Sequence, residues 1–571
     1  MPTNYHETQD ALGNMSTIYS MDIGDTFSGS LSLNGDTDWV AVTLIAGQSY
    51  TFALDGSGAS PLSDPYLRLY DSTGSQIAFD DDGGPGLNSS LTFTATASGT
   101  YYIAADAYNQ ASSGDYTMSM VETPALPVLS YDDIAAQLTD GYWSFFGGGS
   151  RAFDVAPGGS LTVDITGLTA AGQALAIAAL QTWSGAIGIN FVFVNGNADI
   201  TFDDENSGAY STSHVVNGVI QSSFVNVSTA WLASSGTTLD SYSFQTYLHE
   251  IGHALGLGHA GNYNGSASYG TDNFYKNDSW QASVMSYFDQ IDNTFINANF
   301  AYVVTPMIAD ILAMQALYGV AGNIRLGNTT YGDNSNAGGI YDQISGLTNA
   351  VTFTILDDGG HDKIDFRSAT TDQRVDLSPG SISDVGGLIG NMSIAFGTII
   401  EDFLSGSGDD IIAGNTANNR LKGGAGRDEI RGLQGKDKLF GQNGNDQLFG
   451  GAKKDKLFGG KGNDQLKGGN GRDTLAGGRG DDVQTGGAGK DKFVFKSSVI
   501  GADTITDFTN DVDTLVLDDA LWGGGLSAAQ VVSNFATVVG GDVVLDFGGG
   551  NTITLTGFGN SADLVDDISI V

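Results

Sequence analysis

The chain contains the sequence H-E-x-x-H-x-x-G-x-x-H, which starts at His249. On a helix, His249 and His253 lie one turn apart on the same face, so their imidazoles can bind one Zn²⁺ together. Gly256 tolerates a positive φ and lets the chain turn, which brings His259 within reach as a third ligand. Glu250 follows the first ligand and is placed to take a proton from a zinc-bound water. The alternative is an ordinary helical turn with buried core histidines. It does not explain why Gly256 and His259 also stand at the spacing of the extended zinc motif.

A methionine and a tyrosine follow the zinc motif at a spacing that is typical of one family of zinc proteins. Met285 lies twenty-six residues after His259, and Tyr287 follows two residues later. Taken alone, both are more often ordinary core residues. After a zinc motif they make the chain resemble the metzincins, and the tyrosine makes it similar to the serralysin group. The resemblance implies that Met285 forms the floor under the histidines, and that Tyr287 is catalytic and a fifth, switchable zinc ligand.

The segments around the motif also resemble the serralysin catalytic domain. We expect a helix over residues 170–187, a candidate edge strand at 209–211 that can pair with an extended substrate, and a closing helix over 306–318. Ser243 is the predicted N-cap of the helix that carries the histidines. The resemblance implies an endopeptidase whose zinc-bound water is deprotonated by Glu250 and attacks a peptide carbonyl.

Length and composition restrict the classes of protein. A chain of 571 residues suggests about three domains. It has no cysteine, which excludes disulfides and a pro-segment that binds zinc through a thiolate. No apolar run is long enough for a membrane span, and the first residues lack the pattern of an ordinary secretory signal. The formal net charge of −42 disfavours nucleic acid as a partner and favours cations. We expect a monomer.

Ten consecutive nine-residue units run from Ser405 to Val494 and follow the pattern G-G-x-G-x-D-x-U-x. This repeat is typical of calcium-binding parallel β-rolls, in which glycines form tight turns and the aspartate supplies carboxylate oxygen. A flexible Gly/Asp linker is the alternative, but ten units in register argue against it. The aliphatic residue of each unit is predicted to point inward: Ile412, Leu421, Ile430, Leu439, Leu448, Leu457, Leu466 and Leu475.

Several calcium ions are expected in the turns between these units. Lys453 replaces a glycine, so we do not expect a full calcium site in its unit. Asn419 replaces the aspartate of another unit. The segment 357–366 resembles the calcium-bearing start of the serralysin C-terminal domain, which adds Asp358, Gly360 and Asp362. The predicted calcium residues within the repeats are Asp410, Gly423, Gly424, Gly426, Asp428, Asp437, Gly441, Gly444, Asp446, Gly459, Gly460, Gly462, Asp464, Gly468, Gly469, Gly471, Asp473, Asp482 and Asp491.

Positive charge is concentrated in the repeats. Of 23 Lys and Arg residues, 16 lie between Arg420 and Lys496, and this tract holds only 10 acidic residues. Even-numbered units carry ten of these cations and odd-numbered units five, and alternate units fall on one side of a roll. We hypothesise a basic, partly aromatic stripe for an anionic polysaccharide. Charge balancing against the acidic domains is the alternative.

The N-terminal part reads as short alternating strands separated by turns, as in a β-sandwich. Asp38-Trp39, Asp64-Pro65-Tyr66-Leu67 and the acidic run 80–83 make it resemble the bacterial pre-peptidase C-terminal domain. Asp64, Asp80, Asp81 and Asp82 can hold a calcium or form a solvated acidic turn. Substrate or surface binding is the usual inference for this module, and covering of the active site is another.

The predicted fold class is multidomain: an N-terminal all-β sandwich, an α+β zincin catalytic domain and a C-terminal calcium-binding parallel β-roll. The predicted boundaries are an N-terminal tail at 1–15, the sandwich at 16–122, a linker at 123–129, the metzincin zinc protease domain at 130–320 and the repeat domain with a secretion signal at 321–571.

Secretion follows from the resemblance to serralysins. That family leaves the cell unfolded through an ABC-type (type I) secretion apparatus, and the acidic residue and apolar tail at 567–571 resemble its signal. We therefore predict an extracellular, zinc-dependent endopeptidase that acts on proteins or peptides. A catalytically silent calcium-dependent adhesin and a zinc enzyme for a non-peptide substrate are the alternatives.

Overall fold

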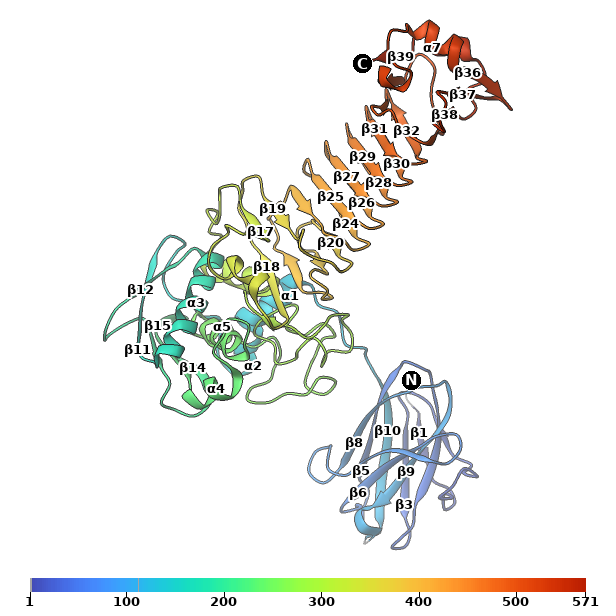
Figure 1. Cartoon of the computed structure of the whole chain (residues 1–571). Coiled ribbons are helices and arrows are strands. Elements are labelled where there is room, and N and C mark those ends of the chain that lie inside the picture. The colour runs from blue at the N-terminus through green and yellow to red at the C-terminus, as the bar shows by residue number, and fades with distance from the viewer. Residues whose placement is uncertain (1–2, 111) are drawn as a thin grey trace. The chain divides into compact units, whose positions relative to one another are not determined.

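The computed structural model describes residues 3–110 and 112–571. The chain divides into two compact units, Met1–Pro127 and Val128–Val571, which are described separately (Figure 1). No helix in the described residues has the length and apolar character needed to cross a membrane.

The first unit is a β-sandwich of two five-stranded sheets, ordered β1-β3-β10-β5-β8 and β2-β4-β9-β6-β7. Side chains alternate along each strand, so that Tyr50, Phe52 and Leu54 of β5 enter the core between the sheets. The strands are β1 Asn4–His6, β2 Ser20–Met21, β3 Thr26–Leu31, β4 Asp38–Leu44, β5 Ser49–Gly56, β6 Pro65–Tyr70, β7 Gln76–Asp80, β8 Ser89–Thr94, β9 Gly99–Ala107 and β10 Gly114–Thr123.

The start of the chain departs from the expected tail at residues 1–15. β1 pairs in parallel with β3, with Asn4 opposite Thr26, and so forms an edge of the first sheet. The side chain of Glu7 reinforces this contact, because its carboxylate accepts hydrogen bonds from the backbone N–H groups of Ala11 and Ser30. No local sequence pattern indicates that these residues pair with a strand 22 residues later in the chain. The sequence therefore predicted a tail at residues 1–15.

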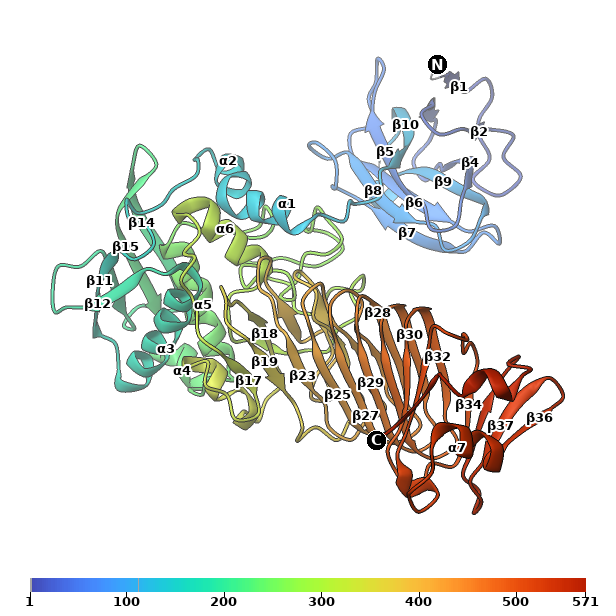
Figure 2. The ribbon, with the colours of Figure 1, turned by 90° about the horizontal axis from the view of Figure 1, so that it is seen from above.

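The second unit begins with helices and a five-stranded sheet of order β12-β11-β13-β15-β14. The strands pair in parallel except β14, which lies at the edge antiparallel to β15, as the sequence predicted. Figure 2 shows α3 and α5 on one side of this sheet. The elements are α1 Tyr131–Ala136, α2 Tyr142–Phe145, β11 Ser160–Gly167, α3 Ala170–Ile187, β12 Asn190–Phe193, β13 Ile200–Asp203, β14 Ala209–Val216, β15 Val219–Val227, α4 Thr229–Ser235, α5 Tyr242–Ala254, β16 Tyr302–Val303 and α6 Ile308–Tyr318.

The helix α5 carries the histidine motif and is held by both packing and polar contacts. Trp183 of α3 is fully buried, and its indole N–H donates to the carbonyl of Leu248, 2.9 Å away. The predicted N-cap was wrong by two residues: Ser241 caps the helix through Phe244 N–H, and Ser243 is buried inside the first turn. Both serines precede apolar residues, so propensity alone does not separate them.

Most of the remainder of the unit is a β-roll made of two ten-stranded sheets, parallel except at the end of the second sheet, where β36, β37 and β38 pair antiparallel. We call them the first roll sheet, which contains β25, β27, β29, β31 and β33, and the second roll sheet, which contains β26, β28, β30 and β32 (Figures 1 and 2). The central strands are β25 Arg420–Ala425, β26 Glu429–Arg431, β27 Lys438–Asn443, β28 Gln447–Ala452, β29 Lys456–Lys461, β30 Gln465–Gly471, β31 Thr474–Arg479, β32 Val483–Gly489 and β33 Lys492–Phe495.

Other strands extend the roll sheets at both ends. The first roll sheet also includes β17 Thr330–Gly332, β19 Lys363–Asp365, β23 Asp402–Leu404, β35 Thr514–Leu517 and β39 Ile568–Ile570. The second includes β20 Arg374–Asp376, β24 Ile411–Ala413, β34 Ala502–Ile505, β36 Ala536–Val539, β37 Asp542–Asp546 and β38 Thr552–Leu555. A smaller sheet joins β16 to β18 Val351–Ile355, β22 Met392–Ile394 and β21 Ile382–Ser383, and α7 Ala528–Phe535 packs near the end.

The inward aliphatic positions of the repeats are confirmed. The eight predicted side chains are at most 1% exposed, and register pairs stack Leu439 on Leu457 in one sheet and Leu448 on Leu466 in the other. One apolar residue per nine-residue unit is therefore enough to build a continuous core, because each strand is flanked in its sheet by the strands of the preceding and following turns of the roll.

Candidate metal centre

Three imidazoles converge where α5 ends. His249 and His253 project from the helix, and His259 follows a turn in which Gly256 has a φ of +114°. A Cβ on Gly256 would collide with the carbonyl of Arg151, so only glycine fits there. His253 Nε2 and His259 Nε2 are 3.0 Å apart, and one nitrogen of each histidine lies within 4.8 Å of the others. The structure thus brings the three predicted ligands together.

Backbone carbonyls fix the orientation of all three rings. The Nδ1 atoms of His249, His253 and His259 lie 2.9, 2.8 and 2.9 Å from the carbonyls of Val284, Leu257 and Tyr263. A carbonyl only accepts, so each Nδ1 carries the proton and each Nε2 presents a lone pair to the centre.

Burial reinforces this state of the histidines. It lowers the pKa of His249 to about 4 and that of His253 to about 3, and it lowers the pKa of His259 well below its ordinary value. Neutral imidazoles with converging lone pairs repel one another unless a cation lies between them. The three nitrogens therefore fit Zn²⁺, for which imidazole is a preferred ligand.

Two side chains with acid–base chemistry border the histidines. Glu250 is 6% exposed, and its Oε2 has no hydrogen-bond partner among the described residues. Burial raises the pKa of Glu250 to about 8. The ring centroid of Tyr287 lies 4.5 Å from that of His259 and 6.0 Å from that of His249. Burial raises the pKa of Tyr287, so its hydroxyl stays protonated at neutral pH.

Met285 lies directly under the helix that carries the ligands. It is fully buried, and its Sδ is 2.7 Å from the position that a Cβ on Gly252 would take. Glycine at 252 therefore allows the thioether to approach the backbone of α5 between His249 and His253. This position agrees with the floor that the resemblance implied for Met285.

Two buried carboxylates hold the loop around Met285, and sequence reasoning missed both roles. Asp310 accepts hydrogen bonds from Ser283 Oγ (2.6 Å) and from the N–H groups of Val284 and Met307 (both 2.8 Å). It is fully buried at the start of α6, which fixes the turn before Met285. An acidic residue in the first turn of a helix is usually explained by its interaction with the helix dipole. The sequence therefore does not indicate that Asp310 also holds the turn before Met285.

The second carboxylate, Asp278, supports the third histidine. Asp278 accepts hydrogen bonds from the hydroxyls of Tyr263 (3.2 and 3.1 Å) and Ser286 (2.7 Å). The carbonyl of Tyr263 in turn accepts from Nδ1 of His259. Asp278 therefore positions His259 through one intermediate residue, and nothing in its local sequence indicates this contact.

The histidines open into an elongated cleft along the edge strand. Two hollows of about 370 and 630 Å³ share His249, Glu250 and Tyr287 in their walls. Ala209 and Tyr210 of β14 line both hollows, and β14 has no strand on its outer side among the described residues. A chain in extended conformation can therefore lie beside β14 and cross the site.

A second kind of cation site repeats along the roll. Most repeat aspartates donate their backbone N–H to Oδ1 of the aspartate eighteen residues later, as from Asp446 to Asp464 (2.8 Å). Asp482 and Asp491 donate in the same way to Asp503 and Asp513. Oδ2 has no partner among residues 3–110 and 112–571, and burial raises the pKa of Asp464 to about 8. The same unpartnered Oδ2 occurs in Asp410, Asp428, Asp437, Asp446, Asp455, Asp464, Asp473, Asp482 and Asp491. Rows of buried carboxylate oxygens fit calcium, which prefers oxygen ligands.

The glycines of the repeats make room for these carboxylates. A Cβ on Gly423, Gly441 or Gly459 would collide with the Oδ2 of the aspartate five residues later. Lys453 adopts a φ of 77° in place of a glycine, and Asp455 in its unit still presents an unpartnered Oδ2. The lysine therefore does not remove the carboxylate that a calcium ion would use.

Asn419 behaves differently from the aspartates. Its Oδ1 accepts from Asn415 N–H (2.8 Å), and its amide donates to the carbonyls of Ile400 and Glu401 (both 3.2 Å). The hydrogen-bonding groups of the Asn419 side chain thus all have partners in the protein, so this turn does not need a cation.

The predicted site at the start of the repeat domain is partly assembled. Asp362 is buried, its Oδ1 accepts from Thr329 N–H (2.7 Å), and its Oδ2 has no partner within the described ranges. Asp358 instead accepts from Ile324 N–H (2.7 Å), and Gly360 has a φ of 148°. Asp362 therefore matches the pattern of the repeat carboxylates, whereas the carboxylate of Asp358 has a protein donor.

Acidic groups also gather in the first unit. Asp64, Asp81 and Asp82 place one oxygen each within 4.8 Å of the others, whereas Asp80 accepts from the N–H groups of Gly83 and Ser90. Sequence reasoning missed a second group, which consists of Glu7, Asp10 and the buried Asp38. These residues are separated in the sequence and meet only because β1 adds to the sheet.

Comparisons with known proteins agree with this arrangement. Residues 321–570 match the family model described as peptidase M10 serralysin C terminal, residues 36–107 match the bacterial pre-peptidase C-terminal domain, and residues 229–304 match peptidase M66. A solved pre-peptidase C-terminal domain of a collagenase from Bacillus anthracis aligns with 18% of this chain and 92% of that chain, at 19% identity and a TM-score of 0.15.

Curated relatives include several proteases. Metallopeptidase AprA of Pseudomonas marginalis is 39% identical over 269 residues, 44% of this chain and 55% of the relative. Serralysin of Photorhabdus luminescens is 37% identical over 261 residues, 44% of this chain and 54% of the relative. Serralysin B of Dickeya chrysanthemi is 38% identical over 251 residues, 41% of this chain and 51% of the relative. The chain spans about half the length of the curated relatives it matches.

Residues 321–570 are therefore similar to the C-terminal domain of serralysins, and residues 36–107 are similar to the bacterial pre-peptidase C-terminal domain. The curated relatives named above are serralysins and metallopeptidases.

The unpartnered carboxylate oxygens predict how the roll responds to calcium. Asp464→Asn removes one buried charge, and we expect the calcium concentration at half-maximal folding, followed by far-ultraviolet circular dichroism, to rise by about tenfold or more. Glu429→Gln removes a charge on the outside of β26 and is the matched control, with an unchanged midpoint. Equal midpoints for Asp464→Asn and the original protein would contradict calcium binding at these oxygens.

Proposed function

We propose that this protein is a secreted, zinc-dependent endopeptidase that hydrolyses proteins. The observation that carries the proposal is the convergence of three Nε2 lone pairs beside the unpartnered carboxylate of Glu250, in a cleft bordered by a free strand edge. The resemblance to metallopeptidases of the serralysin type supports the same reaction.

His249, His253 and His259 would hold one zinc ion, with Nδ1 of each ring anchored by a carbonyl. When bound, zinc would supply a Lewis acid that polarises the scissile carbonyl and makes water more acidic. Glu250 takes the proton of the attacking water and passes it to the leaving amine. Oε2 of Glu250 has no donor among the described residues, so it is free to accept and pass on this proton.

Tyr287 and Met285 complete the centre in this proposal. The Tyr287 hydroxyl accepts a hydrogen bond from Gly265 N–H (3.2 Å) and stays protonated, so it can donate to the oxygen that gains negative charge during attack. As a further part of the proposal, the Tyr287 oxygen would be an additional zinc ligand in the absence of substrate. Met285 supports α5 below the ligands and does not touch substrate.

The peptide is bound by the edge of β14. One side of this strand pairs with β15, and its other side offers backbone N–H and C=O groups to an extended substrate. Because the two hollows share Ala209, Tyr210 and Glu250 in their walls, side chains of a peptide held along β14 have room near the scissile bond. An elongated groove favours a polymeric substrate over a small molecule.

The repeat carboxylates would bind several structural calcium ions and couple folding of the roll to calcium outside the cell. Scarce calcium inside the cell would keep the roll unfolded, which suits export through an ABC-type apparatus. We propose residues 130–320 as the catalytic domain of zincin type and 321–571 as the calcium-dependent repeat domain. The expected monomer is part of this proposal.

Loss of the general base tests the proposed reaction. Glu250→Gln should lower casein hydrolysis by roughly 10²–10⁴-fold in protein refolded with calcium and zinc, because no other carboxylate replaces the base. Zinc content should be unchanged, since Glu250 is not a ligand. Glu205→Gln, an exposed residue after β13, is the control. Retained hydrolysis in Glu250→Gln, with a folded protein, would refute the assignment.

The hydroxyl of Tyr287 has a separate test. Tyr287→Phe should reduce kcat by about 10²-fold, the usual effect of removing one donor to a developing oxyanion, with a smaller change in KM. Tyr302→Phe changes a half-buried hydroxyl of β16 and should leave kcat as it was. A raised KM with an unaltered kcat would assign Tyr287 to substrate binding only.

A further inference from the structure

The two roll sheets differ in charge at the same outward position. Register pairs align Arg420, Lys438, Lys456, Thr474 and Lys492 across the first roll sheet. The equivalent positions of the second roll sheet hold Ile411, Glu429, Gln447, Gln465 and Val483. The inward residues are similar in both sheets, so packing does not explain why this row is basic in the first roll sheet only.

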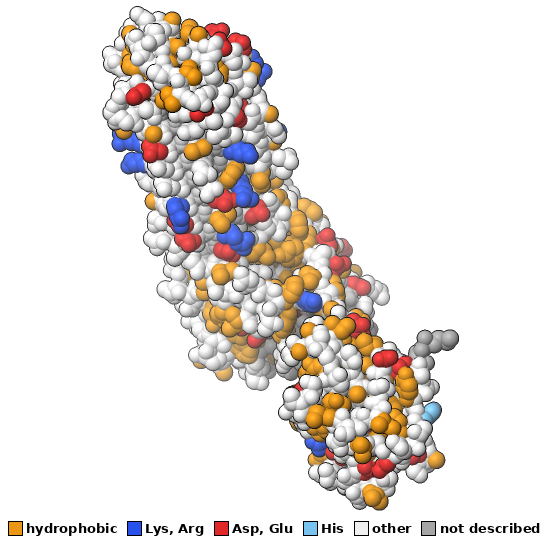
Figure 3. Space-filling view, turned by 90° about the vertical axis from the view of Figure 1, so that its right-hand side faces the viewer, with side chains coloured by type: hydrophobic (Ala, Val, Ile, Leu, Met, Phe, Trp, Pro, Cys, Tyr) orange, Lys and Arg blue, Asp and Glu red, His pale blue; other side chains and the backbone are white. Residues whose placement is uncertain are grey.

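These cations are exposed, and among the described residues only Arg420 has a carboxylate partner. Arg420 lies 3.9 Å from Asp402, whereas Lys438, Lys456 and Lys492 make no ion pair within the part of the chain that the structure describes. Neighbouring strands in a sheet are about 4.8 Å apart, so successive cations repel one another. Figure 3 shows Lys and Arg side chains gathered over the roll, in the upper part of the view. Such a row is stabilised when an anion lies along it.

An apolar ridge runs beside the charged row. Lys422, Phe440, Phe458, Ala476 and Val494 occupy the next outward position of the same strands. The rings of Phe440 and Phe458 stack with centroids 5.0 Å apart and an angle of 10° between their planes. Lys422 Nζ lies 5.8 Å from the ring centre of Phe440, so charge and apolar surface lie side by side.

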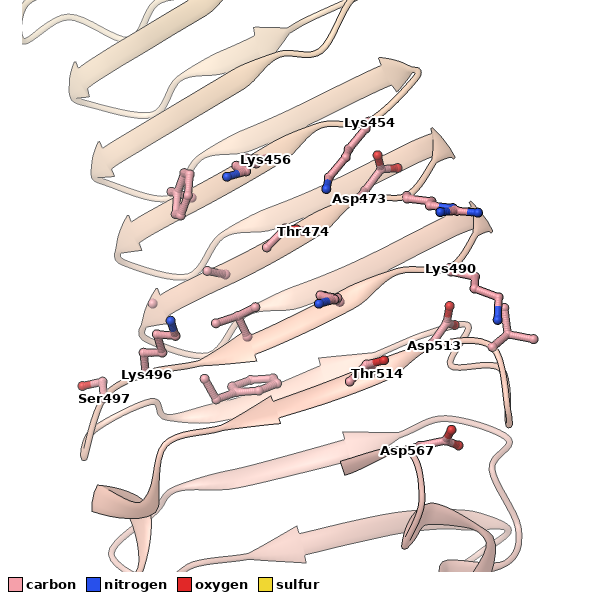
Figure 4. A pocket seen from close by; sticks show the side chains of 18 of the residues that line it. Lys454, Lys456, Asp473, Thr474, Lys490, Lys496, Ser497, Asp513, Thr514 and Asp567 are labelled. Carbon is pink, nitrogen blue, oxygen red and sulfur yellow. The ribbon is translucent and has the colours of Figure 1, made fainter. Parts of the chain in front are cut away.

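The charged row ends in a hollow. Its volume is about 1000 Å³, and Lys454, Lys456, Arg472, Lys490, Lys492 and Lys496 line it. Figure 4 shows Lys454 and Lys490 toward one edge of the strands and Lys496 toward the other, and Lys456 and Thr474 lie between them at the same register position on neighbouring strands. Asp513 and Asp567 line the hollow beyond Thr514. Cations thus border both sides of a shallow track, and carboxylates close its end.

We propose that this surface binds an acidic polysaccharide of the polyuronate type. We call it the basic stripe, formed by Arg420, Lys438, Lys456 and Lys492 with the cations of the hollow. A polyuronate carries one carboxylate on each sugar ring, and the length of one pyranose unit is close to the spacing between strands. Successive carboxylates therefore meet successive strands, while the C–H faces of the rings pack on Phe440 and Phe458.

Nucleic acid fits the basic stripe less well. Single strands bind to proteins by stacking bases on aromatic faces, but Phe440 and Phe458 already cover each other, and the other face of Phe440 lies beside Lys422. Duplex DNA carries charges much more closely spaced than the strands of the roll. The residues outside the basic tract carry a formal charge of −48, which repels a long polyphosphate.

The test uses a matched pair of variants of the full chain, saturated with calcium. The first is Lys438→Gln with Lys456→Gln and Lys492→Gln, which removes three charges from the basic stripe. The control is Arg431→Gln with Lys467→Gln and Arg479→Gln, which removes three exposed charges elsewhere on the roll. Circular dichroism verifies that both variants fold. Binding to immobilised polymannuronate, to dextran and to single-stranded oligothymidylate is measured at two salt concentrations.

We expect the original chain and the control to bind polymannuronate alike and not to bind dextran. The basic-stripe variant should bind polymannuronate about tenfold more weakly, with a smaller dependence on salt, because fewer counterions are released. Equal loss in both variants would reduce the effect to net charge and overturn the proposal. Tighter binding of oligothymidylate than polymannuronate, or no binding of polymannuronate, would also overturn it. This outcome is independent of the peptidase, since none of these residues lies near the histidines.

Discussion

One constraint recurs through the structure: potential ligand atoms are buried without a hydrogen-bond donor among the described residues. Three imidazole lone pairs meet beside Glu250, and the roll lines up aspartate oxygens that accept no hydrogen bond from the described residues. A buried polar atom without a partner costs free energy, so bound cations would stabilise both regions in the proposed function. The roll can therefore couple folding to calcium, and the centre can couple activity to zinc.

The histidine centre and the roll are mechanically connected within the second unit. Gln245 of α5 accepts from the N–H of Val303 in β16, a strand that pairs with β18 of the region after residue 321. Asp240, just before α5, accepts from the N–H of Thr348 (2.9 Å). These contacts connect the helix that carries His249 and His253 to the segment that precedes the repeats.

The sequence predicted the centre well because short-range spacing determines it. His249, Glu250, His253 and His259 lie within one helix and its following turn, and the inward residues of the roll recur at a fixed period. Contacts between distant segments were missed, since no local pattern encodes them: Asp278 reaches His259 through Tyr263, and β1 joins a sheet beside β3. The basic stripe was predicted in part. The nine-residue period indicated that the cations gather on one side of the roll, but it did not indicate the hollow at the end of the row.

X-ray absorption at the zinc edge, on protein refolded with calcium and zinc and then freed of unbound metal, tests whether the three histidines bind zinc together. We expect one zinc ion per chain with three imidazole nitrogens among its ligands, and two imidazole nitrogens in His259→Ala. Retention of no zinc by a folded chain, or a shell unaffected by His259→Ala, would contradict this expectation.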